Sequence, residues 1–213
     1  MPQVLKEEVR ERILTSALEV FATRGYADAT MSDIAAHAGL GTASLYRYYA
    51  SKEALFETVV TPTLAARFEE LLEKRVRALA SLGRSNAPGP SEDRGEEMLR
   101  FWVENRLAVV VLLDRAAGTH YAHYGERFVE LLVSTSLAQL RSAHPGLRIS
   151  ATARFVLTRI FENTRRMLAA ILAEHAQEKS LREAIEAFWS YQLPGLEGFA
   201  QWVGARQRLA GPD

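Results

Sequence analysis

The stretch from Thr30 to Lys52, TMSDIAAHAGLGTASLYRYYASK, constrains the fold most because it predicts two short helices that meet at a glycine turn. Thr30 is followed at the third helical position by Asp33, and this spacing is a capping box that starts a helix. Gly39 ends that helix because glycine readily adopts the positive φ of a helix C-cap. A second helix begins near Gly41 or Thr42. Two such helices joined at a steep angle form a helix-turn-helix unit.

The second helix of this unit has one apolar side and one polar side. Leu45 and Tyr49 are four residues apart, so both point toward the core, while the polar side chains between them face elsewhere. The second helix of a helix-turn-helix fits the major groove of B-DNA. Similar helical corners occur in proteins that never touch DNA, so the unit alone leaves both interpretations open.

The wider segment from Ile13 to Phe56 carries a longer pattern around this unit. The residues of the pattern are Ile13, Ala17, Phe21, Gly25, Thr30, Ile34, Ala35, Ala38, Gly39, Leu45, Tyr46, Tyr49, Lys52, Glu53 and Leu55. With them the segment resembles, almost position by position, the amino-terminal domain of TetR-family transcriptional regulators. The resemblance covers about the first quarter of the chain. It implies a DNA-binding domain over residues 1–56 and a helical ligand-binding and dimerisation domain over residues 57–213.

The second helix offers side chains that suit DNA. Thr42 and Ala43 lie at its amino end, where they can touch a thymine methyl or a base edge, and Arg47 can reach guanine or phosphate. The resemblance implies phosphate contacts by Tyr46, Tyr48, Lys52 and the capping Thr30, with Ser32 beside it. The predicted DNA-binding residues are Thr30, Ser32, Thr42, Ala43, Ser44, Tyr46, Arg47, Tyr48 and Lys52. For Lys52 a solvated surface side chain is the alternative.

The rest of the chain has helical periodicity, and no segment alternates as a strand does, so the predicted fold is all-α with about nine helices. Pro62 predicts a break near residues 59–61, and Pro194 a bend in the last helix. The composition of residues 83–91 predicts a loop. The apolar run from Leu107 to Leu113 predicts a helical segment that is buried on nearly all sides.

Composition limits the function classes. The chain has no cysteine, which excludes disulfides and thiolate chemistry and is compatible with a reducing cytoplasm. The amino terminus becomes charged too early for a signal peptide, and no apolar run is long enough to span a bilayer. Basic and acidic residues balance at 26 each. Phosphate binding must therefore come from local placement, and we expect a shallow salt dependence.

Two further predictions concern the carboxy-terminal part. The last two helices carry more apolar surface than one bundle face needs, which favours a homodimer, with burial inside the chain as the alternative. The middle helices predict a pocket for a partly aromatic or lipophilic small molecule, although most of these aromatic residues also suit a core. The predicted pocket residues are Trp102, Arg106, His120, Tyr121, Tyr124, Phe128, Phe155, Glu162 and Asn163. No metal site and no cofactor are predicted.

The sequence thus favours a ligand-responsive repressor that binds palindromic operator DNA as a homodimer and is released by an inducer. One alternative is an enzyme or a small-molecule carrier on a helical bundle, but no nucleophile with an acid–base partner and no phosphate loop is evident. A second alternative is a constitutive DNA-binding regulator without a ligand.

Overall fold

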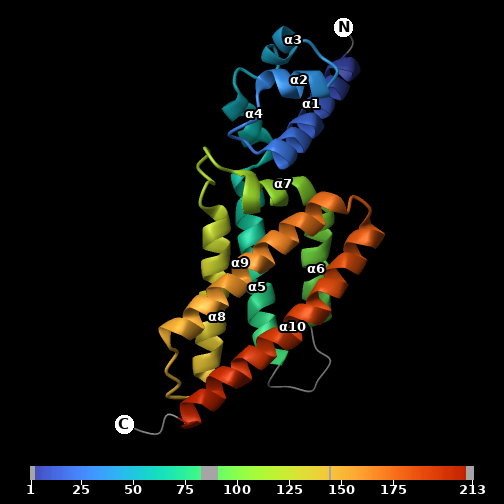
Figure 1. Ribbon diagram of the computed structural model, residues 1–213. Helices are drawn as coiled ribbons and strands as arrows, with labels where there is room; N and C mark the ends of the chain where they lie inside the picture. The colour runs from blue at the N-terminus through green and yellow to red at the C-terminus, as the bar shows by residue number, and fades with distance from the viewer. Residues whose placement is uncertain (1–2, 83–90, 144, 210–213) are drawn as a thin grey trace.

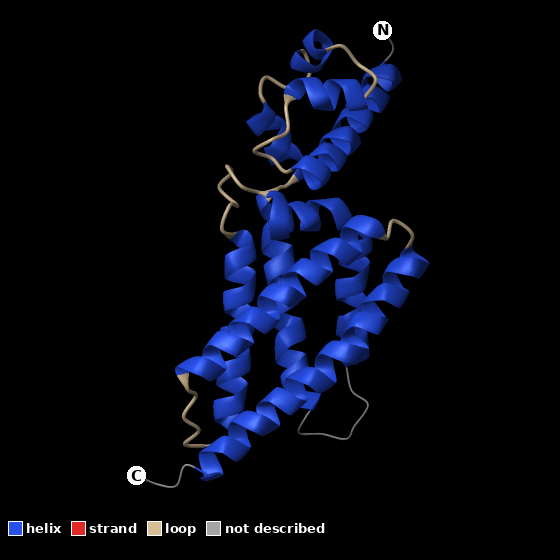
Figure 2. Ribbon diagram, viewed as in Figure 1, coloured by secondary structure: helices blue, strands red, loops and turns tan. Residues whose placement is uncertain are grey.

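The chain folds into two helical lobes in a computed structural model that describes residues 3–82, 91–143 and 145–209. These residues form ten α-helices and one π-helical turn and contain no strand, which confirms the predicted all-α class (Figure 2). The first four helices make a small lobe at one end of the molecule, and the remaining helices make a larger lobe (Figure 1). No helix in the described ranges combines the length and apolar character needed to cross a membrane.

The small lobe consists of α1 (Gln3–Arg24), α2 (Met31–His37), α3 (Thr42–Tyr46) and α4 (Lys52–Val59). Two helices as short as α2 and α3 are not stable in isolation, because helix nucleation is costly and they bury little surface. The long α1 supplies that surface, as its apolar period predicts. The fully buried side chains of the four helices are Ile13, Ala17, Phe21, Ile34, Ala35, Leu45, Leu55 and Phe56.

The chain breaks between α4 and α5 (Pro62–Leu82), where the sequence predicts a break. Pro62 is the first residue of α5, a position at which its missing N–H costs no helical hydrogen bond. The Oγ1 atom of Thr61 accepts a hydrogen bond from the Leu64 N–H at 3.2 Å, which satisfies one free donor of the first turn. The predicted domain division at residue 56 falls within α4.

The next predicted helix is divided in the structure into α6 (Ser91–Glu104), α7 (Arg106–Val110) and the π-helical turn η1 (Val111–Arg115). The division lies at Asn105, whose φ of −119° and ψ of 23° are not helical. This raises the number of α-helices from the predicted nine to ten. The apolar run is buried as predicted, apart from half-buried Leu107. The loop predicted for residues 83–91 lies, except for Ser91, outside the described residues.

The larger lobe is completed by α8 (Tyr124–Ala143), α9 (Ala151–Glu174) and α10 (Glu178–Leu209). Helix α8 begins three residues later than its apolar period predicts, because Thr119 organises a turn before it: its Oγ1 accepts from the Tyr121 N–H at 3.0 Å. Helices α9 and α10 cross the front of the lobe in Figure 1.

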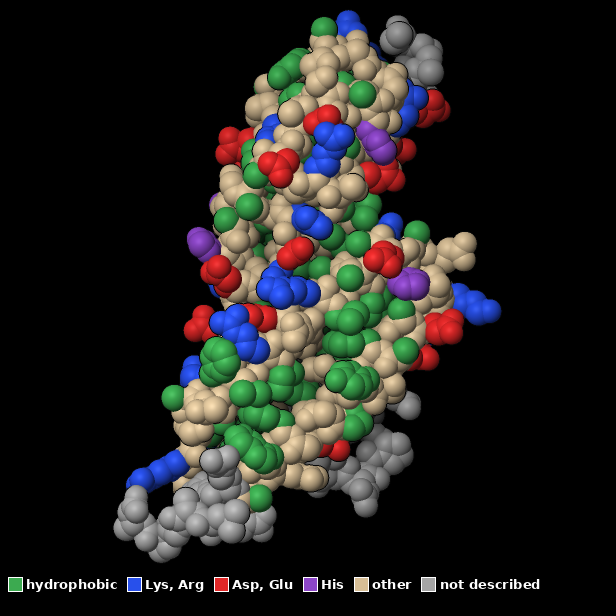
Figure 3. Space-filling view, viewed as in Figure 1, with side chains coloured by type: hydrophobic (Ala, Val, Ile, Leu, Met, Phe, Trp, Pro, Cys, Tyr) green, Lys and Arg blue, Asp and Glu red, His purple; other side chains and the backbone are tan. Residues whose placement is uncertain are grey.

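Large apolar side chains are exposed mainly on these last two helices. Of the six such side chains in the part of the chain that the structure describes, five lie on α9 and α10 and the sixth is Tyr46 on α3. The five are Phe155, Val156, Met167, Tyr191 and Trp202. Figure 3 shows hydrophobic side chains gathered in several neighbouring groups over α9 and α10 on this face of the larger lobe, and we call this the hydrophobic area.

The two lobes meet at the loop after α1. The backbone N–H of Tyr26 donates a hydrogen bond of 2.9 Å to the carbonyl oxygen of Arg115 in η1. The Tyr26 ring packs against the ring of Phe56, with centroids 4.9 Å apart, and Phe56 in turn lies 6.5 Å from the ring of Tyr121 in the larger lobe. The loop is therefore held by a backbone hydrogen bond on one side and by an aromatic cluster on the other.

Candidate nucleic-acid interface

Helices α2 and α3 are joined by the tight turn that the sequence predicts. Gly39 has a φ of 66°, a left-handed conformation that costs glycine little and other residues more. The Leu40 N–H donates to the carbonyl of Ala35 at 2.8 Å, which closes the end of α2, and the half-buried Leu40 side chain packs against the core. This geometry confirms the predicted corner between the two helices.

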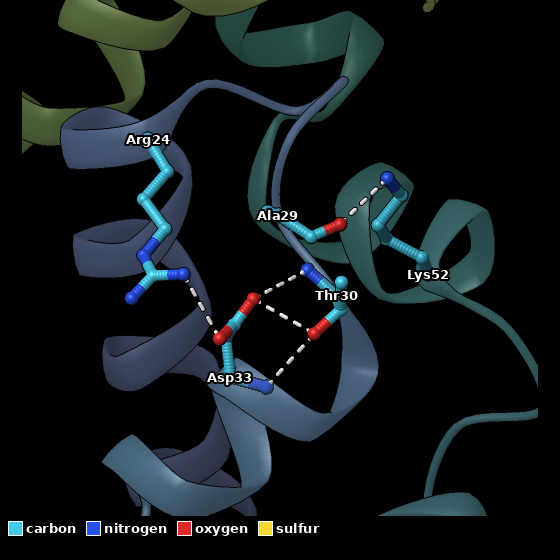
Figure 4. A network of polar contacts seen from close by, with 5 residues as sticks. All are labelled: Arg24, Ala29, Thr30, Asp33 and Lys52. Atoms are coloured by element: carbon cyan, nitrogen blue, oxygen red, sulfur yellow. Dashed lines mark hydrogen bonds and ion pairs between the residues drawn. The ribbon is translucent and has the colours of Figure 1, made fainter.

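The start of α2 is fixed by a closed set of hydrogen bonds around Thr30 and Asp33 (Figure 4). The Asp33 carboxylate accepts from the Thr30 hydroxyl at 2.7 Å and from the Thr30 N–H at 3.0 Å. The Thr30 oxygen accepts from the Asp33 N–H at 3.1 Å. Arg24 of α1 adds an ion pair to the same carboxylate at 3.0 Å. The hydrogen bonds from Thr30 and, to a lesser extent, the charge of Arg24 hold the pKa of the Asp33 carboxyl below its usual range.

The capping set gives the first testable prediction. Thr30→Ala removes the side chain that caps α2, so we expect the free energy of unfolding to fall by about 1 kcal/mol. Ser32→Ala is the matched control, because Ser32 is exposed in the first turn of α2 and is not the capping residue. Urea denaturation followed by circular dichroism measures both. Equal stability of the two variants would contradict the capping role.

Lys52 has a role that the sequence does not predict. Its ammonium donates to the backbone carbonyl of Ala29 at 2.8 Å (Figure 4). It also donates to the carbonyl of Tyr26 at 2.6 Å and lies 4.3 Å from the centre of the Tyr26 ring. The lysine therefore ties the start of α4 to the loop between α1 and α2. In the sequence, Lys52 places a positive charge in the first turn of a helix, where the helix dipole disfavours it, and we interpreted this as a sign of a phosphate contact. That contact stays a prediction.

Helix α3 is anchored in the core on one side and exposed to solvent on another. Leu45 is fully buried and Tyr49 is buried, so these two anchor the helix as predicted. Ala43, Tyr46 and Arg47 are exposed, Tyr46 by 51%. The other predicted DNA-binding residues of this region, Thr42, Ser44 and Tyr48, are half-buried, whereas Thr30 and Ser32 are exposed at the start of α2. Helix α3 lies at the end of the molecule that is farthest from the larger lobe (Figure 1).

Arg47 is held close to the surface of α3. Its guanidinium Nη2 donates to the Ser44 hydroxyl at 2.9 Å, which fixes the side chain along the helix. Helix α3 is shorter than predicted: it ends at Tyr46, and the next two residues, Arg47 and Tyr48, form a turn. The exposed side chains therefore come from one helical turn and the residues directly after it.

The predicted ligand residues do not gather around one cavity. Trp102, Tyr121, Tyr124 and Phe128 are buried, which is the core position that we left open as the alternative for the aromatic residues. Arg106 donates to the carbonyls of Leu172 at 2.6 Å and Ala173 at 3.0 Å, so it satisfies free carbonyls in the last turn of α9. The side chains that face solvent in this set are His120, Phe155 and Asn163.

The described residues of the larger lobe form a larger and a smaller cavity. The larger, of about 640 Å³, is a groove between α8 and α9 that is closed at one end by η1, and Glu162 is the predicted residue that lines it. The smaller, of about 190 Å³, is lined by Tyr124 and Phe128 together with residues of α5. The groove also has arginines on α9 that the sequence analysis missed, although their recurrence at positions 154, 159, 165 and 166 was visible.

Metal-ligating side chains are dispersed. In the described ranges no three histidine, aspartate or glutamate side chains come close enough together to hold a metal ion. His123 and Glu126 form an exposed pair, with the His123 Nδ1 atom 3.0 Å from a carboxylate oxygen of Glu126.

Comparison with known proteins identifies the amino-terminal segment. Residues 13–59 match the family described as bacterial regulatory proteins, tetR family. The uncharacterized HTH-type transcriptional regulator YdgC of Bacillus subtilis (strain 168) is 43% identical over 54 residues, which are 25% of this chain and 28% of that protein. The HTH-type transcriptional regulator SrpR of Pseudomonas putida is 39% identical over 54 residues, 25% of each chain. The chain thus spans about a quarter of the length of these relatives.

Among solved structures, the chain is similar to NalD, the secondary repressor of the MexAB-OprM multidrug efflux pump in Pseudomonas aeruginosa. The two are 20% identical, and the alignment covers 84% of this chain and 97% of NalD with a TM-score of 0.38.

Proposed function

Because residues 13–59 of this chain belong to the TetR family of bacterial regulatory proteins, we propose that the protein is a repressor that binds palindromic operator DNA as a homodimer and is released by a small-molecule inducer. The observation that carries the proposal is the setting of α3. Leu45 anchors the helix in the core, while Ala43, Tyr46 and Arg47 are exposed at the far end of the molecule. Such a regulator acts in the cytoplasm, where its DNA lies.

The proposed DNA contacts divide into two kinds. Thr42 and Ala43, at the amino end of α3, read base edges or a thymine methyl, and Arg47 reads guanine or binds phosphate. Phosphate contacts position the helix, and these we assign to Thr30, Ser32, Ser44, Tyr46, Tyr48 and Lys52. Through residue 57 the chain has six basic and eight acidic residues, so few phosphates are neutralised. We therefore expect the affinity to fall only gradually with salt.

The homodimer is proposed on the exposed apolar side chains of α9 and α10. Exposed apolar patches of this kind mark interaction surfaces, and a two-fold axis through the patch would pair it with itself (Figure 3). A dimer also doubles the number of base pairs that are read, because each copy of α3 contacts one half of a palindrome. Sedimentation equilibrium of the full chain tests this part directly, with a mass of twice 23.8 kDa expected.

The inducer site is proposed in the larger lobe. The groove between α8 and α9 has a volume typical of small-molecule sites, about 300 to 1,000 Å³. It is bounded by η1, which also provides the carbonyl that binds the Tyr26 N–H of the small lobe. A ligand in the groove can therefore influence the lobe that carries α3. The coupling is reciprocal, so operator DNA should weaken ligand binding by the factor by which the ligand weakens DNA binding.

Tyr46→Ala is the sharpest test of the DNA contact. Tyr46 is exposed, so the substitution leaves the core intact, and we expect about a 10-fold loss of operator affinity because each half of the dimer loses a phosphate hydrogen bond. Fluorescence anisotropy with labelled upstream DNA measures the loss. Tyr46→Phe should lose nearly as much if the hydroxyl makes the contact. Wild-type affinity in both variants would remove the assignment. Lys52→Ala is a weaker test of DNA contact, because the Lys52 side chain also binds carbonyls of the loop between α1 and α2, so a loss of affinity could come from a change in that loop.

Mixing the purified protein with its own upstream DNA separates the function classes. A DNA shift that a compound reverses is expected for the inducible repressor. A shift that no compound reverses would indicate a constitutive regulator, and the absence of any shift at every salt concentration would favour a carrier or an enzyme. The same titration over a salt series gives the number of phosphates neutralised.

A further inference from the structure

The groove between α8 and α9 has two walls of different charge. The α9 wall carries the guanidinium groups of four arginines, at positions 154, 159, 165 and 166, and the facing α8 wall carries Glu126 and Glu130. Its apolar lining residues are Leu112, Leu113, Ala116, Ala117, Ala122, Val129 and Val133. In Figure 3 basic and acidic side chains gather at the edge of the hydrophobic area on α9. A ligand in the groove thus meets both aliphatic and charged side chains.

Two of the four arginines are neutralised within the protein. Arg165 binds Asp114 at 2.7 Å, and Arg159 binds Glu162 at 2.5 Å. Arg154 and Arg166 are exposed, and their side chains form no ion pair or hydrogen bond with any other residue that the structure describes. They lie twelve residues apart on α9, which separates them by about 18 Å along the helix axis. Each end of the α9 wall therefore has a guanidinium available for an anionic group.

We propose that this groove binds a small organic anion with an apolar body, whose carboxylate or phosphate group is held by the arginines of α9. Arginine suits this role because its planar fork pairs with carboxylate and phosphate in two parallel hydrogen bonds. The glutamates of the facing wall orient the ligand, because they repel its anionic group toward α9. That this anion is the inducer rests on the proposed function.

The inner end of the groove is where such an anion affects the rest of the molecule. Arg165 is the least exposed charged side chain there, with 17% of its surface exposed, and it donates to the Leu113 carbonyl as well as to Asp114. An anionic group that reaches Arg166, the next residue, competes with Asp114 for Arg165. Leu113 and Asp114 belong to η1, whose Arg115 carbonyl binds the small lobe. Loosening η1 therefore acts directly on the loop that precedes α2.

The ligand class is tested with three probes that share one body and differ in charge. They are 3-phenylpropanoate, 3-phenylpropanol and 3-phenylpropylamine, titrated into the full chain by calorimetry at low salt without DNA. We expect the carboxylate to bind more tightly than the alcohol, and the amine least. Equal binding of the three probes, or no binding of the carboxylate, would overturn the proposal.

Variants locate the site. Arg154→Ala/Arg166→Ala should weaken binding of the carboxylate at least about 10-fold, because charge-assisted hydrogen bonds are lost. Arg141→Ala is the matched control, since Arg141 is exposed on α8 and does not line the groove. Glu130→Gln should tighten binding roughly 3-fold, because a repelling charge is removed. Wild-type affinity in the double variant, or a loss as large in Arg141→Ala, would place the anion elsewhere.

Adding operator DNA distinguishes this proposal from the proposed function. If the wild-type chain binds the carboxylate but no DNA, the anion groove stands and the repressor assignment fails. If it binds DNA but not the carboxylate, only the ligand class fails. In the full scheme the carboxylate lowers DNA affinity in the wild type and has no effect in Arg154→Ala/Arg166→Ala. Unchanged DNA affinity in the presence of saturating carboxylate would overturn the assignment of the groove as the inducer site.

Discussion

Replacing Phe56 by alanine is expected to lower the free energy of unfolding by about 3–5 kcal/mol, the usual range for a buried phenylalanine. The side chain is 1% exposed, and its ring lies 5.5 Å from Phe21 and 4.9 Å from Tyr26 between ring centroids. The same ring faces Tyr121 of the larger lobe. The cavity would open where the lobes meet, so the small lobe should lose stability and its fixed position together. Urea denaturation by circular dichroism, with DNA binding measured in parallel, tests this.

Phe56→Leu is the control for the cavity. It keeps an apolar side chain of moderate size at the same position, so we expect it to cost clearly less than Phe56→Ala and to retain DNA binding at low temperature. A loss below about 1 kcal/mol in the alanine variant would mean that the neighbouring rings close over the cavity. The contact between the lobes would then be looser than its geometry indicates.

Gly125→Ala is expected to cost about 2–3 kcal/mol, because α8 and η1 approach too closely for a side chain. A Cβ built on Gly125 would overlap the backbone oxygen of Leu113 and lie 3.1 Å from Cδ of Arg165. A backbone atom within η1 cannot turn away as a flexible side chain can. Alanine has the higher helix propensity by about 1 kcal/mol, so without the overlap the substitution would stabilise α8. Thermal and urea denaturation measure the sign of the effect.

Gly95→Ala is the matched control. Gly95 also lies in a helix, but the nearest atoms to its added Cβ belong to the guanidinium end of Arg75, at 3.3 Å, which is able to move. We expect its stability to change by less than about 1 kcal/mol. Equal behaviour of the two glycine variants would show that α8 can shift away from η1 at little cost.

Local signals made the small lobe predictable. The capping pair Thr30 and Asp33, the glycine at position 39 and the apolar spacing of Leu45 and Tyr49 each fix structure within a few residues of themselves. All three predictions are confirmed, as is the break before Pro62. Because α3 is anchored by residues on one side, the exposure of the opposite side also follows from the sequence.

Tertiary contacts explain what the sequence did not predict. Lys52 turns toward carbonyls that lie more than twenty residues earlier in the chain, a contact that no local pattern encodes. Helix α6 ends at Glu104, because the backbone of Asn105 is not helical although the apolar period of the sequence continues past it. The predicted pocket set combined aromatic residues with a few polar ones, and of these Glu162 lines the groove, whose other lining side chains are mainly aliphatic and charged. The helical periodicity of a sequence shows which side of each helix is buried, but it does not show which helices pack against each other.

The hydrogen bond between the Tyr26 N–H and the Arg115 carbonyl uses only main-chain atoms. Every amino acid has a carbonyl group, so the residue at position 115 can change without losing this attachment. The side chains of one lobe can therefore change during evolution while this hydrogen bond to the other lobe is kept. Chimeras in which the small lobe is joined to a foreign partner should keep this hydrogen bond wherever a peptide oxygen lies at the same place.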